Sequence, residues 1–280
     1  MRALRWNCPS CGGVALTPFC PSCGERRLAP ADLRLRDVLV QAFNALTSVD
    51  GRLLRSLRDV CLRPGELTLA YMDGRRKPYL GPLELFFLAN VAFFALQSLA
   101  DTHSFSTTLA SHLQQQDWRG FANRLVERHL QATGRTLPAY APLFDHRIAV
   151  YARSLIALMV VPFGLLVAAL FGRRPLPALT HAIFAVHTYV FVLLLLCAGS
   201  LAVAIDRVVG GPALHSPMFD HGLSALLLAA CVAYLHRAVA RVYPGKPLHT
   251  GLRTAVLGMA IALIFMGYRF ILLPITLWTT

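Results

Sequence analysis

Four cysteines near the N-terminus have a spacing that suits metal binding. Cys8 and Cys11 form one Cys-x-x-Cys pair, Cys20 and Cys23 form a second, and a glycine follows each pair. The short gap lets both thiolates of a pair face one ion, and the glycine permits the tight turn that this needs. Two such pairs complete a tetrahedral site of sulfurs. We therefore predict a structural zinc ion in a knuckle lobe at residues 1–28.

Other uses of these cysteines fit the sequence less well. A redox motif needs a thioredoxin-like strand and helix around it, and residues 1–28 supply neither. Disulfides need an oxidising compartment, whereas charge places this end of the chain in the cytosol. Four protein ligands leave the metal no open position, so catalysis there is not expected. Nucleic-acid binding is not expected either, because the lobe carries few cations.

The histidines do not combine into a second reactive site. His181 and His187 are six apart; on a helix they are separated by about 240° and face different directions. His215, Asp220 and His221 share one loop, where a metal site is an alternative that no established spacing supports. The sequence contains no nucleophile elbow, phosphate-binding loop or dinucleotide turn. We therefore predict that the protein is not an enzyme.

A basic, aromatic stretch at residues 64–82 separates the cysteine-bearing part from the first apolar run. It holds three consecutive cations between two tyrosines: Tyr71, Arg75, Arg76, Lys77 and Tyr79. Positive flanks resist translocation and attract anionic headgroups, and a phenol ring suits the headgroup layer. We predict that these residues anchor the chain at the membrane, or form a docking surface for a partner or a lipid headgroup.

The composition is that of an integral membrane protein. Of 280 residues, 56% are hydrophobic and 15% are charged, against about 25% charged residues in a soluble domain. The apolar residues form five runs of membrane-spanning length, at about residues 83–100, 154–171, 181–205, 223–239 and 254–277. The predicted fold class is an all-α integral membrane protein with about five transmembrane helices and a small N-terminal zinc-ribbon or knuckle lobe.

The distribution of cations sets the predicted orientation. The chain has 27 lysines and arginines against 14 acids. The lysines and arginines concentrate before residue 82 and in the short loops after the second and fourth apolar runs. The positive-inside rule places these segments in the cytoplasm. We therefore predict a bacterial inner-membrane protein with a cytosolic N-terminus, a periplasmic C-terminus and an outer loop at residues 101–150.

Residues 29–81 are predicted to form basic amphipathic helices at the inner membrane surface. Apolar residues recur every three or four positions over residues 35–46 and again over 53–61, with arginines between them. Such helices lie on a membrane or pack on each other as a hairpin, and the sequence leaves both alternatives open. The transmembrane domain then occupies residues 82–280.

One arginine falls inside a predicted span. Arg269 lies near the outer end of the fifth apolar run. Its side chain either extends to the outer interface or pairs with an acid at the outer end of another span, Asp206 or Asp101. The intramembrane pair of Arg269 with Asp206 is the specific hypothesis.

The order of these motifs resembles a known family. Two knuckle pairs, an amphipathic helix, an Asp-Gly break, a helix ending in Pro-Gly and the pattern Tyr-x-x-Gly-Arg-Arg-Lys-x-Tyr-x-x-Pro before a membrane helix are similar to a bacterial zinc-knuckle membrane family catalogued as a domain of unknown function. The matching residues are Cys8, Cys11, Cys20, Cys23, Asp50, Gly51, Pro64, Gly65, Tyr71, Gly74, Arg75, Lys77, Tyr79 and Pro82. The resemblance implies an inner-membrane protein with a cytosolic zinc-binding end, and it implies no activity.

These features together predict an adaptor or assembly protein. The zinc knuckle would be an independent lobe on a linker at residues 25–30, and it would contact a protein partner or lipid headgroups. Membrane lipids and a cytosolic protein are the expected partners, and a homo-oligomer is an alternative state. A transporter would need oligomerisation, because five spans do not divide into equal repeats. An oligomeric transporter and a membrane-embedded metal enzyme remain the alternative functions.

Overall fold

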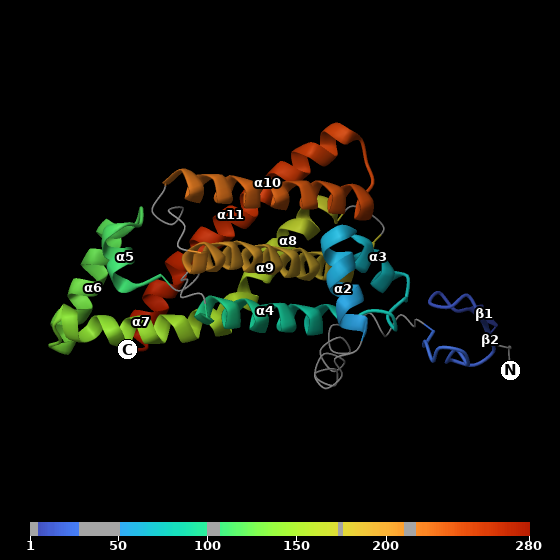
Figure 1. Ribbon diagram of the computed structural model, residues 1–280, viewed down its shortest axis with the longest axis horizontal. Helices are drawn as coiled ribbons and strands as arrows, with labels where there is room; N and C mark the ends of the chain where they lie inside the picture. The colour runs from blue at the N-terminus through green and yellow to red at the C-terminus, as the bar shows by residue number, and fades with distance from the viewer. Residues whose placement is uncertain (1–4, 28–50, 100–106, 173–175, 210–216) are drawn as a thin grey trace.

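The computed structural model describes residues 5–27, 51–99, 107–172, 176–209 and 217–280. A small N-terminal lobe, here the knuckle lobe (residues 5–27), lies beside a bundle of helices (Figure 1). The predicted helix at residues 35–46, Asp101 and His215 lie outside the described residues. The elements are β1 Trp6–Asn7, β2 Val14–Ala15, α2 Gly51–Leu62, α3 Glu66–Met72, α4 Pro82–Leu99, α5 Leu109–Gln114, α6 Arg119–Thr133, α7 Leu137–Leu155, η2 Ile156–Met159, α8 Val160–Phe171, α9 Ala178–Val209, α10 Pro217–Val242 and α11 Pro247–Trp278.

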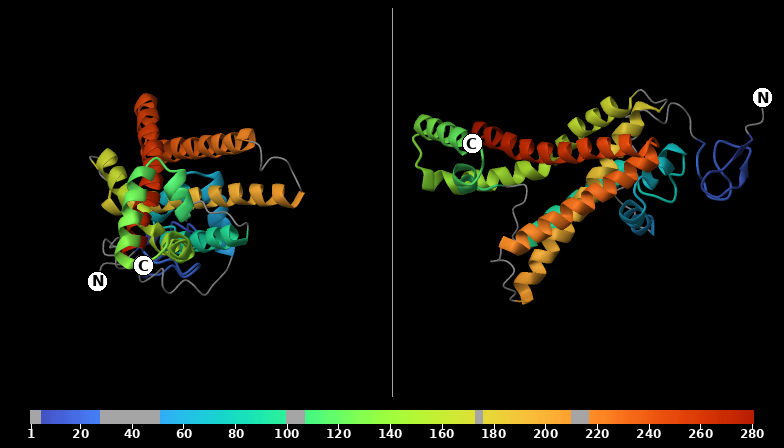
Figure 2. Two further views of the ribbon diagram at one scale, coloured as in Figure 1. Left: turned by 90° about the vertical axis from the view of Figure 1, so that its left-hand side faces the viewer. Right: turned by 90° about the horizontal axis from the view of Figure 1, so that it is seen from above.

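Five helical segments among the described residues are long and apolar enough to cross a membrane. Their bounds are Pro82–Leu99, Leu137–Phe171, Ala178–Asp206, Gly222–Val242 and Pro247–Trp278. The predicted fold class is therefore confirmed. Helix α9 contacts α4, α8 and α10, whereas α11 packs on α7, α8 and α10. Figure 2 shows that α11 and α7 diverge from α9 and α10 toward the end of the bundle away from the knuckle lobe.

The second span begins earlier in the chain than we predicted. Helix α7 starts at Leu137 and continues through the 3-10 turn η2 into α8, so the predicted loop at residues 101–150 is helical over much of its length. Every fourth residue of α7 is buried: Tyr140, Phe144, Ile148 and Ala152. Charged residues on its other face interrupt the apolar run and hide this helix from the sequence pattern. Pro162, which has no N–H to donate, accounts for the nearby break in α-helical geometry.

Helices α5 and α6 form a distal lobe (residues 107–133) at the end of the bundle opposite the knuckle lobe (Figure 1). Asp145 on α7 accepts a hydrogen bond from the N–H of Leu109 at 2.7 Å. Trp118 donates its indole N–H to Nδ1 of His112 at 3.1 Å. Burial lowers the pKa of His112 to about 4, so the ring is a neutral acceptor at pH 7. Gly134, with φ +65°, ends α6.

Helix α2 packs on the bundle through both apolar and polar side chains. It contacts α3 and α9, and Val60 is buried in the main core. Ser56 Oγ accepts a hydrogen bond from the N–H of Leu80 at 2.9 Å. Asp59 Oδ2 accepts one from the hydroxyl of Tyr79 at 2.9 Å. Helix α2 therefore holds the chain that leads into α4.

Helix α3 was not predicted from the sequence, which shows a short segment between a Pro-Gly pair and the basic residues. It contacts α9 and α10. Thr68 shares a buried hydrogen bond of 3.0 Å with Nδ1 of His187 on α9. Glu66 lies 3.5 Å from the guanidinium of Arg241 on α10. These polar contacts fix α3 against the ends of two spans.

Replacement of Gly65 by alanine should destabilise the protein by about 1–3 kcal/mol. Gly65 has φ +83°, and an added Cβ would lie 3.0 Å from Val242 Cγ2 and 3.2 Å from the carbonyl oxygen of Ala238. Thermal melting of the purified protein in detergent measures the effect. Gly251→Ala is the matched control, because a Cβ there meets nothing within 4 Å and α11 is helical. Equal melting temperatures for the two variants would refute this account of Gly65.

Candidate metal centre and the turn beside it

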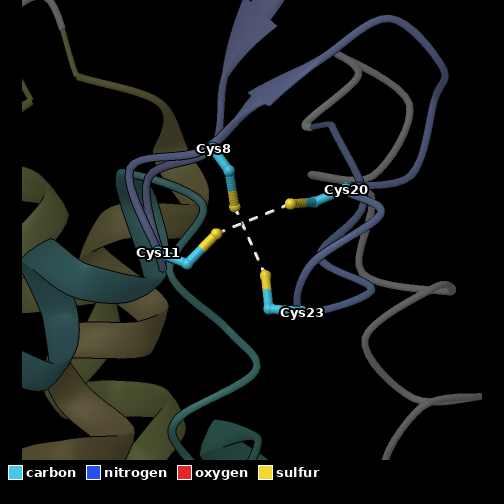
Figure 3. A group of neighbouring side chains, drawn as sticks. All are labelled: Cys8, Cys11, Cys20 and Cys23. Carbon is cyan, nitrogen blue, oxygen red and sulfur yellow. Dashed lines mark hydrogen bonds between the residues drawn. The ribbon is translucent and has the colours of Figure 1, made fainter.

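The four cysteine side chains converge on one point, as Figure 3 shows. The sulfurs of Cys8 and Cys23 are 3.5 Å apart, as are those of Cys11 and Cys20. All four sulfurs lie within 4.8 Å of one another. A tetrahedral ion about 2.3 Å from each thiolate separates its sulfurs by about 3.8 Å. The geometry therefore suits a metal ion, with the four ligands that the sequence predicts.

The two halves of the centre have the same backbone structure. The N–H of Cys8 donates to the carbonyl of Gly13 at 2.8 Å, and the N–H of Cys20 donates to Glu25 at 2.7 Å. Gly12 and Gly24 follow the two pairs with φ +74° and +70°. Both glycines take the left-handed conformation, as the knuckle motif requires. The repeat in the sequence is thus a repeat in structure.

Of the four sulfurs, that of Cys20 has surroundings that favour a thiolate, whereas the neighbouring sulfurs raise the pKa of Cys11 and Cys23. Backbone N–H groups of Cys23 and Ser22 lower the pKa of Cys20 to about 6, because they stabilise the negative sulfur. Thiolate is the form that ligates metals. Four such ligands close the coordination sphere, which is the arrangement of structural sites.

The knuckle lobe has little else to stabilise it. Strands β1 and β2 pair antiparallel, with Trp6 opposite Ala15. Its buried apolar cluster consists of Cys8, Ala15 and Cys20, with Trp6 and Cys23 packed beside them. So small a core cannot offset the entropy of ordering the chain, and a metal bound at the four cysteines would supply much of the folding free energy.

The knuckle lobe is not independent of the helical part. Glu25 is buried, and its Oε2 accepts hydrogen bonds from Ser10 Oγ at 2.6 Å and from the backbone N–H of Lys77 at 2.9 Å. Gly24 lies beside the Lys77 side chain. The expectation of a lobe attached only by a linker is therefore wrong. One signal was present in the sequence, since Glu25 is the sole acid among residues 1–28.

Two of the five predicted anchor residues, Arg75 and Tyr79, contact acidic side chains of the protein itself. The guanidinium of Arg75 is 3.2 Å from Glu66 and 3.3 Å from Asp73. The Tyr79 hydroxyl donates to Asp59. Burial, followed by the contact with Asp59, raises the pKa of Tyr79. These residues stabilise the turn between α3 and α4, which we call the basic turn (residues 73–81).

The other three anchor residues have different surroundings. Lys77 supplies the backbone N–H that Glu25 accepts. Tyr71 is buried, and the guanidinium carbon of Arg76 lies 4.4 Å from the centre of its ring. Of the five residues, Tyr71 is buried and Lys77 is exposed, and their use as a membrane or partner surface stays a prediction.

The remaining candidate residues lie apart from the metal centre. Arg269 donates through Nε to Thr107 Oγ1 at 2.8 Å. Among the ion pairs of the described residues, none joins it to Asp206. His181 and His187 have separate partners, because Nδ1 of His181 lies 2.9 Å from the Tyr243 hydroxyl. The side chains of Asp220 and His221 are outside the described part of the chain.

The fold and the centre define a membrane protein with a small cysteine-rich lobe that can hold a metal. Residues 50–94 match a family model described as "Protein of unknown function (DUF3667)". The match runs from the start of α2 into α4 and leaves the four cysteines of the centre outside. Comparison with curated proteins and with solved structures gives no match. The resemblance to an uncharacterised family is therefore confirmed for the segment that contains the basic turn.

The double change Cys8→Ser and Cys11→Ser should remove all stoichiometric metal. It should also speed hydrogen exchange in the basic turn. Loss of the metal unfolds the knuckle that positions Glu25, so the Lys77 N–H loses its acceptor. Metal analysis and hydrogen exchange of residues 73–81 measure the two effects.

Glu25→Ala in the same assay should keep the metal and still speed exchange of Lys77 roughly fivefold. Ser10→Ala removes the other donor to Glu25 and should leave exchange near that of the unchanged protein. A full equivalent of metal in the double variant would contradict the ligand set. Unchanged exchange in Glu25→Ala would contradict the docking contact.

Proposed function

We propose that the protein is a membrane adaptor or assembly protein, whose zinc-stabilised knuckle lobe binds a protein partner at the cytosolic side of a bacterial inner membrane. The observation that carries this proposal is the docked, closed thiolate centre. Its four sulfurs lie within 4.8 Å of one another, and Glu25 joins the lobe to the basic turn. The centre fixes the shape of the knuckle lobe, and Glu25 fixes the position of the lobe on the membrane domain.

The lobe presents apolar side chains to solvent. Val14 in β2 is 49% exposed, and Leu16 and Phe19 after it are 65% and 57% exposed. Strands β1 and β2 lie on the side of the lobe away from the helices (Figure 1). We call these three residues the hairpin patch. Large apolar groups left exposed on so small a lobe mark an interaction surface.

Charge indicates what kind of partner fits. Arg5, Arg26 and Arg27 are exposed on the lobe, whereas its sole acid, Glu25, is buried. A partner segment that combines an apolar anchor with acidic residues complements this surface. Anionic lipid is less suitable, because the strands of the lobe face away from the helices that would cross the membrane.

An adaptor is better supported than the alternative functions. A transporter would need polar groups directed into a pathway between the spans. The buried histidines of α9 instead bond to Thr68 and to Tyr243. A membrane metal enzyme would need a second metal site. The cysteine centre is the cluster of metal-binding side chains that the described residues provide.

The orientation that we propose can be tested with reporter fusions. The cations before residue 82 and in two short loops favour the cytosol for the knuckle lobe. Fusions should read cytosolic after Arg27, Pro175 and Pro244, and periplasmic after Gly134, Gly211 and Thr280. A cytosolic signal at Thr280 would contradict an odd number of spans.

Partner binding can be tested at the hairpin patch. A photoreactive residue in place of Val14 should crosslink to a protein in native membranes. Leu16→Ser with Phe19→Ser should reduce that product roughly tenfold, because two apolar contacts are lost. Arg26→Glu with Arg27→Glu should also reduce it.

Leu54→Ser is the control for this experiment, because Leu54 is an exposed leucine on α2. It should leave the crosslinked product unchanged. Crosslinks to lipid alone, or a product that survives both double variants, would refute the adaptor proposal.

A further inference from the structure

The three cations of the basic turn are not equivalent. Arg75 has two acidic partners, Glu66 and Asp73. Lys77 lies beside the backbone of the knuckle lobe at Gly24. Arg76 differs, because its Nε and Nη2 atoms are buried and have no hydrogen-bond partner among the described residues. One side of its guanidinium group therefore has donors without acceptors.

A buried, unsatisfied guanidinium is costly. A charged N–H group removed from water needs an acceptor. The acids described at this end of the bundle already have partners: Glu25, Asp59, Glu66, Asp73 and Glu84. The described side chains thus supply no acceptor for Arg76, and one from elsewhere would complete it.

The two unsatisfied atoms indicate the shape of the acceptor. Nε–H and one Nη2–H of an arginine point the same way along one edge of the guanidinium plane. That edge donates two parallel hydrogen bonds to two oxygens of a carboxylate or phosphate group. In Arg76 both atoms of the edge are unpaired, so the site fits an oxyanion with two oxygens in reach.

The position of Arg76 favours phosphate. Its guanidinium stacks on the ring of Tyr71, and Tyr71 clusters with Ile183 and Leu179 in the first turns of α9. The start of a helix carries a partial positive charge and binds phosphate readily. Thr180 in that same turn is 1% exposed, and its hydroxyl has no partner within the described ranges. The first turn of α9 thus offers an unpaired hydroxyl and a partial positive charge.

We propose that Arg76 binds a phosphate-type oxyanion through its Nε–Nη2 edge, on a platform formed by Tyr71 and the first turn of α9. The spans α4 and α9 begin beside it, at Pro82 and Ala178. This is the depth at which phospholipid headgroups lie. The phosphate comes from a lipid headgroup or from free phosphate, and the site does not depend on the partner of the hairpin patch.

Native mass spectrometry of the full-length protein in detergent tests the proposal with three probes. Phosphatidylglycerol carries the phosphate on a lipid, diacylglycerol lacks the phosphate, and inorganic phosphate lacks the lipid. We expect retention of phosphatidylglycerol and not of diacylglycerol. Competition by inorganic phosphate would assign the site to free phosphate, and its failure to compete would assign the site to the headgroup.

Three variants distinguish the two parallel hydrogen bonds from the Nε–Nη2 edge of Arg76, here called its fork, from the effect of its charge. Arg76→Gln should weaken phosphatidylglycerol binding roughly tenfold or more. Arg76→Lys keeps the charge and loses the fork, so it should weaken binding similarly. Arg58→Gln makes the same charge change on the exposed side of α2 and should bind like the unchanged protein. Thermal melting of each variant checks the fold.

Three results would overturn the proposal. The first is equal phosphatidylglycerol binding by Arg76→Lys and Arg58→Gln. The second is equal retention of diacylglycerol and phosphatidylglycerol by the unchanged protein. The third is failure of the unchanged protein to bind either phosphate probe.

Discussion

The basic turn contains backbone N–H groups that no helix or strand satisfies, and three separate parts of the chain satisfy them. Glu25 of the knuckle lobe accepts from Lys77, Ser56 of α2 accepts from Leu80, and Glu84 accepts from Gly81 at the start of α4. Unpaired buried N–H groups are costly, so these side chains fix where the turn lies. The lobe, the surface helix and the first span therefore meet at one short segment.

This arrangement explains how the segment that matches the family model can keep its structure without the four cysteines, which lie outside that segment. Residues 50–94 contain the whole of α2, α3 and the basic turn. That unit holds itself to the bundle through Thr68 and Glu66, which contact α9 and α10. The knuckle lobe adds one further acceptor at Lys77. A lobe of different sequence could dock on the same turn if it offered a carboxylate there.

The sequence was sufficient for those features that depend on local spacing. The cysteine pairs, the glycines after them and the five apolar runs are each readable within a few residues. Features that depend on tertiary contacts could not be read in this way. Helix α3 is short and is stabilised by α9 and α10 rather than by its own pattern. Glu25 and Lys77 are 52 residues apart, and no local rule joins them.

The predictions for charged and for buried positions differ from the structure for related physical reasons. The cations of the basic turn suggest an exposed surface. In the structure, however, Arg75 pairs with Glu66 and Asp73, and the Tyr79 hydroxyl donates to Asp59. The start of α7 looked like a loop because Asp145, His146 and Arg147 interrupt the apolar run of the helix. One of two hypotheses paired Arg269 with a carboxylate, whereas in the structure it donates to a hydroxyl, that of Thr107. Composition shows which groups are present, and contacts decide how they are used.

The lengths of the spans have a consequence for the surrounding bilayer. The apolar part of α9 has 29 residues, about 44 Å of helix, whereas the hydrocarbon core is about 30 Å thick. Such a helix tilts to match the bilayer. Because α9 and α11 diverge (Figure 2), they lean in different directions. The cross-section of the bundle is then larger in one leaflet than in the other, so the protein displaces unequal numbers of lipids from the two sides of the membrane.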